Sequence, residues 1–456
     1  MSAPPPDLFD RERLRRLLDA ELRDFRDRHP RSLAAHERAR RSLLGGVPMP
    51  WMMRWAGGFP VAVERAHGSR VVDIDGHEYV DLCLGDTGAM AGHGPAPLAD
   101  AVRRQAERGV TTMLPTEDAT WAGDELTRRF GVPRWMFTLT ATDANRAALR
   151  VARQVTGRSK VLVYSYCYHG SVDEAFAVRA ADGRTVARAG NVGPPVDVAQ
   201  TTVAVEFNDP EQLETALATG EIAAVLAEPA MTNMGIVLPD AGYHDTLRRL
   251  TREHGTLLIL DETHTISAGP GGCIGAWNLD ADLVTIGKAI GGGVPSGALG
   301  LSATVADAAL GQSDADYEDT GGVGGTLAGN ALSLAAIRAT LGEVLTDEAF
   351  AHTVPLAERF AEGLGMVLGS YGLPWNVTRL GARAEYRFQP RPARNGTDAN
   401  AAADPQLERY LHLHALNRGL LLTPFHNMAL MAPTTTDDDV DRHTELFDEA
   451  VETLLA

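Results

Sequence analysis

The run Thr285-Ile286-Gly287-Lys288-Ala289-Ile290-Gly291-Gly292-Gly293 decides the fold, because it ends an apolar strand on a lysine and continues with small residues. Glycines leave the amine unscreened, so Lys288 is placed to form a Schiff base. A second apolar strand, Ile259-Leu260-Asp261-Glu262, ends in a carboxylate 27 residues upstream of Lys288. The carboxyl ends of parallel strands point into the ligand crevice of open α/β folds. We therefore expect Lys288 and Asp261 at one site, where an aldehyde cofactor with a basic ring nitrogen would use both.

The size and charge of the chain favour a small-molecule substrate. With 456 residues, the chain is long enough for two lobes that share a large core. It is 44% hydrophobic and 22% charged, as expected of a soluble globular protein. The formal net charge of −18 argues against a nucleic-acid partner or an anionic membrane surface, since either needs a basic patch.

The cysteines and the N-terminus indicate a cytoplasmic protein. Cys83, Cys167 and Cys273 are widely spaced and odd in number, so neither a disulfide framework nor a metal site is expected. The sequence opens without a signal-peptide pattern, and no stretch approaches the roughly 18 consecutive apolar residues of a membrane helix.

Strands and helices alternate between about 135 and 305, which predicts a mostly parallel sheet with helices on both faces. Short apolar segments predict strands at 160–165, 202–207, 223–228, 257–261, 283–287 and 298–302, and helical periodicity falls at 144–155 and 243–254. Residues 8–44 read as an amphipathic helical arm, 71–84 as a hairpin and 390–405 as a surface loop. The predicted domains are 1–80 (arm and hairpin), 81–328 (large domain) and 329–456 (small α+β domain).

Several polar groups follow predicted strands and could hold a cofactor. Thr140-Ala141-Thr142 opens a helix, whose free N–H groups and dipole make a phosphate cradle, although a plain Thr N-cap explains the pattern equally well. Tyr168 and His169 bring aromatic rings to a strand end, where a structural role is the commoner one. Two further candidates are Glu228 and Thr263, and the glycine-rich run 324–330 is a second place for phosphate contact.

Together these motifs resemble the class III, or ornithine-aminotransferase-like, branch of the fold-type I pyridoxal-phosphate enzymes. Within that branch, the chain is most similar to the group of glutamate-1-semialdehyde aminomutases and β-amino-acid transaminases, from about residue 45 to the C-terminus. The resemblance implies a large α/β domain around a mostly parallel, seven-stranded sheet. It also implies a smaller α+β domain built from the N- and C-terminal segments.

The same resemblance implies that pyridoxal 5'-phosphate binds Lys288 as a Schiff base and that Asp261 pairs with its ring nitrogen. The other implied cofactor contacts are Thr140, Ala141 and Thr142 at the phosphate, Tyr168 with the adjacent His169 on the ring, Thr263 beneath it, Glu228 on its hydroxyl side, and Thr326 from a neighbouring subunit. An obligate homodimer with shared sites follows. The chain departs from the family at Ala141, where a glycine is usual, and at His264 after Asp261-Glu262-Thr263.

The implied activity is a ping-pong aminotransferase that moves an amino group from a hydrophobic or aromatic amine or β-amino acid to a keto acid or aldehyde. A 2,1-aminomutase of the glutamate-1-semialdehyde type is the nearest alternative. A decarboxylase or epimerase on the same scaffold and a catalytically idle dimeric ligand-binding protein are more distant ones.

The substrate pocket is predicted from bulky apolar residues and two arginines. The apolar residues are Trp51, Met52, Met53, Trp55, Met90 and Phe425, each of which could equally fill core or a dimer interface. Arg54 and Arg383 are candidates for a substrate carboxylate, because the C-terminal arginine that many family members use is not evident in 423–427.

Overall fold

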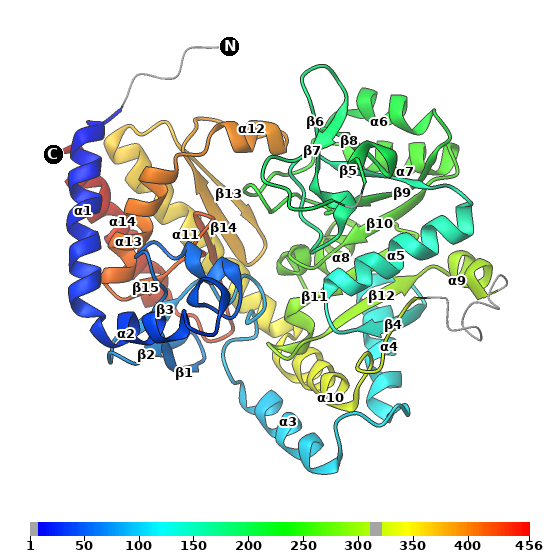
Figure 1. Ribbon diagram of the computed structural model, residues 1–456, viewed down its shortest axis with the longest axis horizontal. Helices are drawn as coiled ribbons and strands as arrows, with labels where there is room; N and C mark the ends of the chain where they lie inside the picture. Colours follow the sequence, from blue (N-terminus) through cyan, green and yellow to red (C-terminus); the bar gives the residue numbers. More distant parts are fainter. Residues whose placement is uncertain (1–7, 195, 311–321) are drawn as a thin grey trace.

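A seven-stranded sheet organises the larger of two lobes in the computed structural model, which describes residues 8–194, 196–310 and 322–456 (Figure 1). Its strands, in spatial order, are β4 (Arg134–Thr138), β12 (Gly297–Leu301), β11 (Leu283–Gly287), β10 (Leu257–Asp261), β9 (Ile222–Ala227), β5 (Lys160–Tyr164) and β8 (Thr202–Val205). The pairs between β11 and β8 are all parallel, and β12 is antiparallel to both of its neighbours. The predicted mostly parallel sheet is therefore confirmed.

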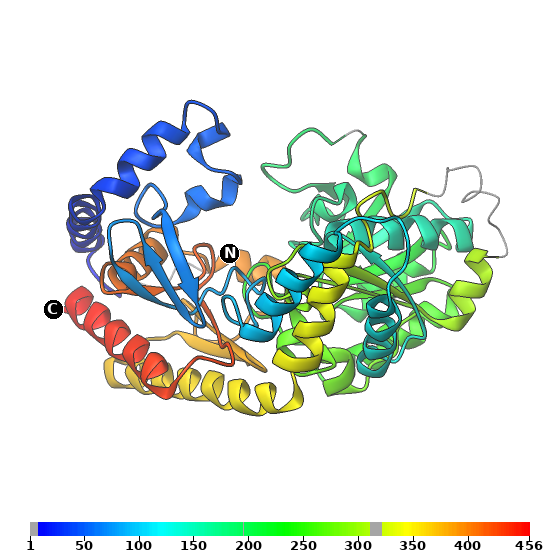
Figure 2. The ribbon, with the colours of Figure 1, turned by 90° about the horizontal axis from the view of Figure 1, so that it is seen from below.

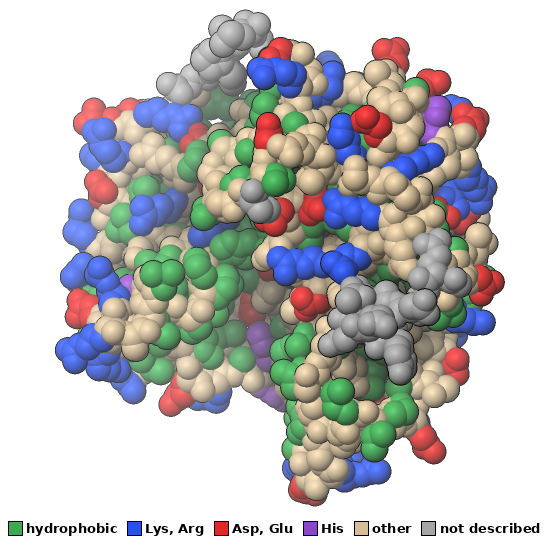
Figure 3. Space-filling view, turned by 45° about the vertical axis from the view of Figure 1, so that its right-hand side comes forward, with side chains coloured by type: hydrophobic (Ala, Val, Ile, Leu, Met, Phe, Trp, Pro, Cys, Tyr) green, Lys and Arg blue, Asp and Glu red, His purple; other side chains and the backbone are tan. Residues whose placement is uncertain are grey.

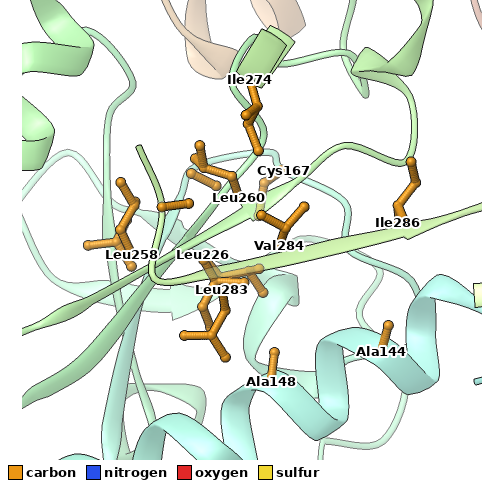
Figure 4. Close-up of a cluster of buried hydrophobic side chains, with 14 of the residues drawn as sticks. Ala144, Ala148, Cys167, Leu226, Leu258, Leu260, Ile274, Leu283, Val284 and Ile286 are labelled. Carbon is orange, nitrogen blue, oxygen red and sulfur yellow. The ribbon is translucent and has the colours of Figure 1, made fainter. Parts of the chain in front are cut away.

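Helices cover both faces of this sheet because its central strands are mostly apolar and buried. On one face lies α5 (Ala141–Thr156), whose Ala144 and Ala148 point toward the strands, while Cys167 and Ile274 lie on the opposite side (Figure 4). The small alanine side chains let the helix axis come close to the sheet. Other large-lobe elements are α3 (Ala96–Arg108), α4 (Glu117–Phe130), β6 (Ala177–Arg179), β7 (Thr185–Ala187), α6 (Pro210–Leu217), α7 (Tyr243–Glu253), α8 (Gly272–Trp277), α9 (Ala303–Leu310) and α10 (Ala331–Ala339).

The smaller lobe combines the two ends of the chain, as predicted. Its elements are α1 (Arg11–Arg28), α2 (Pro30–Ala39), β1 (Val63–His67), β2 (Arg70–Asp73), β3 (Glu78–Asp81), α11 (Asp347–Tyr371), β13 (Asn376–Leu380), β14 (Arg383–Arg387), α12 (Gly396–Ala401), α13 (Pro405–Asn417), β15 (Leu420–Leu421), β16 (Met428–Leu430) and α14 (Asp437–Leu455). One apolar core contains Leu14 and Tyr79 together with Phe360 and Leu446. Figure 2 shows the blue N-terminal and orange-to-red C-terminal segments on the same side of the molecule.

Two local expectations are corrected. Leu334 and Ile337 of α10 pack in the large core, so the small domain begins nearer α11 than residue 329. The 390–405 segment contains helix α12, which forms because the Asn395 side chain accepts a hydrogen bond from the Asp398 amide. The glycine-rich run 324–330 ends at Asn330, which caps α10.

Buried polar groups tie the N-terminal arm to the predicted hairpin. His29 Nδ1 lies 2.6 Å from the Phe25 carbonyl, and its Nε2 lies 2.8 Å from the Tyr79 hydroxyl, which donates to Asp73 over 2.7 Å. Among the described residues, His29, Asp73 and His77 form the group whose side chains are close enough together to hold a metal ion. Because the Tyr79 hydroxyl lies between His29 and Asp73, we interpret the cluster as a structural link between the N-terminal arm and the hairpin.

Two surface properties bear on function. In the described ranges, no helix is long and apolar enough to cross a membrane. On the face drawn in Figure 3, acidic and basic side chains are interspersed, which does not favour binding to a polyanion.

Candidate active site

A cavity of about 370 Å³ lies at the carboxyl ends of the parallel strands. The predicted residues that line it are Thr140, Ala141, Thr142, Tyr168, His169, Glu228, Asp261, Thr263 and Lys288. They come from the ends of several different strands, which parallel pairing brings to one edge of the sheet. The cavity therefore collects the proposed amine, carboxylate and helix N-terminus in one place.

Lys288 directly follows β11 and has a left-handed backbone, with a φ of 48°. Such strain in a residue other than glycine is concentrated at functional sites. The preceding Gly287 brings the strand close to the phosphate-cradle segment, since a Cβ on it would lie 2.9 Å from the Ala141 nitrogen. A side chain at Gly287 would displace the N-terminus of α5 from the lysine.

Asp261 is held as a charged group by three donors. Its Oδ2 accepts hydrogen bonds from Asn145 Nδ2 at 2.8 Å and from His169 Nδ1 at 2.9 Å, and its Oδ1 accepts one from the Thr263 amide at 3.0 Å. Burial opposes the negative charge, but the hydrogen bond and charge of His169, with help from Thr263 and Asn145, lower the pKa of Asp261 from 3.8 to about 2. The cavity thus presents an ionised carboxylate, as a protonated pyridine nitrogen requires.

The surroundings of His169 favour its positively charged form. Burial lowers the pKa of its imidazole, but Cys167 and Asp261 outweigh burial and raise it well above 6.5. The sequence predicts His169 as a cofactor contact. In this geometry its hydrogen bond supports Asp261.

The two interpretations of Thr140, as a plain N-cap and as part of a phosphate cradle, are compatible at the N-terminus of this helix. Thr140 caps α5, because its Oγ1 accepts the Asp143 amide at 3.2 Å, and it also lines the cavity. The amides of Ala141 and Thr142 lie in the first turn, where the helix offers them no carbonyl. These N–H groups and the helix dipole suit a phosphate.

Three further predicted residues, Tyr168, Thr263 and Glu228, line other parts of the cavity. Tyr168 and Thr263 line it, and the Tyr168 ring centroid lies 5.2 Å from that of Trp51. Burial raises the pKa of Glu228 to about 7, against the opposing effects of His169 and Thr232. The buried hydroxyl of Ser296 lines the cavity without a protein partner among the described residues.

The structure adds a polar cluster that was not assigned from the sequence. Lys288 Nζ lies 2.6 Å from His264 Nε2 and 3.4 Å from Asp86 Oδ2, and His264 Nδ1 lies 2.9 Å from Thr87 Oγ1. Asp86 and Thr87 both have left-handed φ angles, of 50° and 81°. The sequence signal was His264, which departs from the family pattern; nothing in the 82–94 loop marked the other two.

The predicted substrate residues are only partly brought to the cavity. Phe425 lies behind Trp51, with ring centroids 5.3 Å apart, and the Arg54 guanidinium lies 4.9 Å from the Phe425 ring centroid. Two predictions are corrected: Met90 is buried in the large core, and Trp55 packs against the core of the small lobe. Neither lines the cavity.

Arg383 and Thr326 lie apart from the cavity lining. The Arg383 side chain is buried and donates from Nη2 to Thr87 Oγ1 over 2.6 Å, so it supports the loop instead of facing a substrate carboxylate. Thr326 lies in an exposed turn and does not line the cavity of its own chain.

These residues fit pyridoxal phosphate. The ionised Asp261 suits its ring nitrogen, the N-terminus of α5 suits its phosphate, and Lys288 suits its aldehyde. The model of the class-III aminotransferases matches residues 51–451, and the chain belongs to this family of pyridoxal-phosphate enzymes. The family assignment leaves the alternative of an idle ligand-binding protein without support.

Similar proteins cover nearly the whole chain. Glutamate-1-semialdehyde 2,1-aminomutase of Chloroflexus aggregans is 34% identical over 93% of this chain and 98% of its own length. A crystal structure of a glutamate-1-semialdehyde-aminomutase from Pseudomonas aeruginosa PAO1, solved also in complex with PMP, has a TM-score of 0.95 and 50% identity over 98% of this chain and 100% of its own. A β-phenylalanine aminotransferase from Variovorax paradoxus has a TM-score of 0.84 and 26% identity over 96% and 97% of the two chains.

Proposed function

We propose that this enzyme is an aminomutase that moves an amino group between neighbouring carbons of a small amino-carbonyl compound, as a 2,1-aminomutase does. The observation that carries its amine chemistry is the meeting of Lys288 and Asp261 at one cavity. The shift within one molecule is supported by the aminomutases that resemble the chain over more than nine tenths of its length. This reverses the order of the two activities expected from the sequence.

The residues have separate tasks in this proposal. Pyridoxal phosphate, when bound, supplies an aldehyde that takes up amines and a ring that accepts electrons from the substrate carbon. Lys288 holds the cofactor and, when released, moves a proton at the substrate carbon as base and acid. Asp261 keeps the proton on the ring nitrogen, and the first turn of α5 binds the phosphate.

Covalent labelling tests the role of Lys288 directly, because the chain contains only two lysines, Lys160 and Lys288. Borohydride reduction of the holoenzyme should fix the cofactor on the peptide with Lys288. The Lys288→Ala variant should lose the visible absorbance and turnover. Lys160→Ala is the matched control, since Lys160 pairs with Glu221 at 2.8 Å on the surface. Label on Lys160, or an active Lys288→Ala enzyme, would contradict the proposal.

The reaction type needs a second experiment. An aminomutase converts its amino-carbonyl substrate without any added keto acid, whereas a transaminase stops after one turnover. Product formation beyond one equivalent per site, with the enzyme in its amine-loaded form and no acceptor present, is the expected result. A strict requirement for an acceptor would identify a transaminase.

A transaminase of hydrophobic or aromatic amines is the second candidate, because aromatic rings gather beside the cavity. Trp51 lines it and contacts both Tyr168 and Phe425. The similarity to the β-phenylalanine aminotransferase supports the same activity. Bleaching of the visible absorbance by a panel of aromatic and aliphatic amines separates the candidates.

We also propose a cytoplasmic homodimer in which Thr326 completes the phosphate site of the other subunit. The exposure of Thr326 in its own chain supports this arrangement. Neither a Lys288→Ala nor a Thr326→Ala homodimer should be fully active. Subunit exchange between the two variants should restore one intact site per heterodimer, so mixing should raise activity. No gain on mixing, with exchange verified, would contradict shared sites.

A further inference from the structure

His264 is packed between Lys288 and the 82–94 loop. Its Nε2 lies 2.6 Å from Lys288 Nζ, and its Nδ1 lies 2.9 Å from Thr87 Oγ1. The imidazole lines the cavity, and 13% of the side chain is exposed. Both ring nitrogens are therefore engaged, one of them by the amine that binds the cofactor.

Arg383 restricts the hydrogen bonds that Thr87 can make. Its Nη2 donates to Thr87 Oγ1 over 2.6 Å, and a guanidinium cannot accept. The hydroxyl retains one hydrogen and one accepting position. If it accepts from Nδ1–H, the lone pair of Nε2 faces Lys288; if it donates to Nδ1, Nε2–H faces a neutral amine. The ring can thus pair with Lys288 in either charge state.

The charges around His264 favour the neutral form of its ring, which is the form that can accept a proton. Burial and then the charge of Lys288 hold the pKa of His264 well below 6.5, with a further contribution from Arg383, while Asp86 and Asp261 act in the opposite direction. Asp86 Oδ2 lies 3.4 Å from Lys288 Nζ, and Asp86 Oδ1 lies 3.8 Å from His264 Nδ1. The Asp86 carboxylate therefore lies beside the positive charge whether Lys288 or His264 carries it.

We propose that His264 is the proton acceptor of Lys288, which deepens the proposed function and rests on the role given there to Lys288. One Nζ–H bond breaks, its electron pair stays on Nζ, and a new N–H bond forms at Nε2. The positive charge moves from the ammonium to the imidazole beside Asp86, and the reverse transfer returns the proton. The forward transfer leaves Lys288 as the neutral amine that must attack a carbonyl inside the cavity. Bulk water is not needed to remove its proton.

The test is the rate at which cofactor-free protein captures pyridoxal phosphate, followed by visible absorbance across a pH series. In His264→Gln, the ammonium loses its base, so capture near neutral pH should be slowed by roughly ten- to a hundredfold. The difference from the wild type should shrink as pH rises, because bases in the solvent then take over the role of His264. Thr87→Val, which removes the partner of Nδ1, should be slowed with the same pH dependence.

His443→Gln is the control, because His443 is a buried histidine in α14 of the small lobe and does not line the cavity. It should capture the cofactor at the wild-type rate. Capture by either site variant at the wild-type rate, or slowed by the same factor at every pH, would overturn the assignment of His264. Failure of the proposed function is distinguishable, since the wild type itself would then form no absorbing linkage at Lys288.

Discussion

Replacing Asp261 by asparagine tests whether its charge organises the site. The substitution keeps the shape of the side chain but replaces one acceptor oxygen with an NH2 group. Three donors converge on the carboxylate, from Asn145 and His169 on one oxygen and from Thr263 on the other. The orientation of Asn145 is fixed, because its own oxygen accepts the Thr285 hydroxyl at 2.6 Å.

The magnitude follows from counting donors. The amide oxygen can serve at most Asn145 and His169, so the Thr263 N–H must face the new NH2 group. One buried hydrogen bond left unmade costs about 1–3 kcal/mol. The variant also loses the charge opposite His169. The contribution of Asp261 to stability is complete above its unfolded pKa of 3.8, and this contribution is lost as pH falls toward about 2. The contribution of His169 to stability is complete below pH 6.5, its ordinary pKa, and this contribution is lost as pH rises.

Thermal unfolding of the cofactor-free protein, measured over a pH series, is the appropriate assay. Asp261→Asn should unfold at a lower temperature than the wild type, with the largest gap between pH 3.8 and 6.5, where both contributions are complete. Asp182→Asn is the control, since Asp182 is exposed beside Arg184; as a surface substitution, it should unfold at nearly the wild-type temperature. Equal unfolding temperatures for the two variants in that window would refute the reasoning.

Three further substitutions probe the cradle, the far edge and the mouth of the cavity. A Cβ on Gly170, whose φ is +77°, would lie 2.0 Å from Thr142 Oγ1, so Gly170→Ala should weaken cofactor binding about tenfold in an equilibrium titration; unchanged affinity would remove Thr142 from the cradle. Because burial raises the pKa of Glu228 from 4.5 to about 7, its contribution to stability is complete below pH 4.5 and is lost as pH rises through about 7. Glu228→Gln should abolish this loss, which a pH series of unfolding temperatures would show, and an identical pH dependence in the variant would contradict it. Trp51→Ala should raise KM for aromatic amines about tenfold while changing KM for small aliphatic ones little, since the lost contact is worth roughly 1–2 kcal/mol; equal changes for both classes would argue against an aromatic wall.

The sequence predicted the parts of the site that depend on strand ends. Lys288 and Asp261 each follow an apolar run, and parallel pairing brings such ends together whatever the loops do. Met90 shows where this reasoning stops. It lies two residues from the cavity-lining Gly88, yet its side chain is buried in the large core. In an irregular loop, no periodicity tells which way a side chain points.

The sequence by itself determined the fold class and the class of cofactor, and it predicted that Lys288 and Asp261 stand at one edge of the sheet, because short patterns along single strands carry this information. Only the tertiary structure decided that His264 and Asp86 stand beside Lys288. Asp86 lies 202 residues from the lysine along the chain, on a loop of left-handed residues that Arg383 supports through Thr87. Contacts of this kind depend on how loops from both lobes pack against the sheet, and local sequence does not encode that packing.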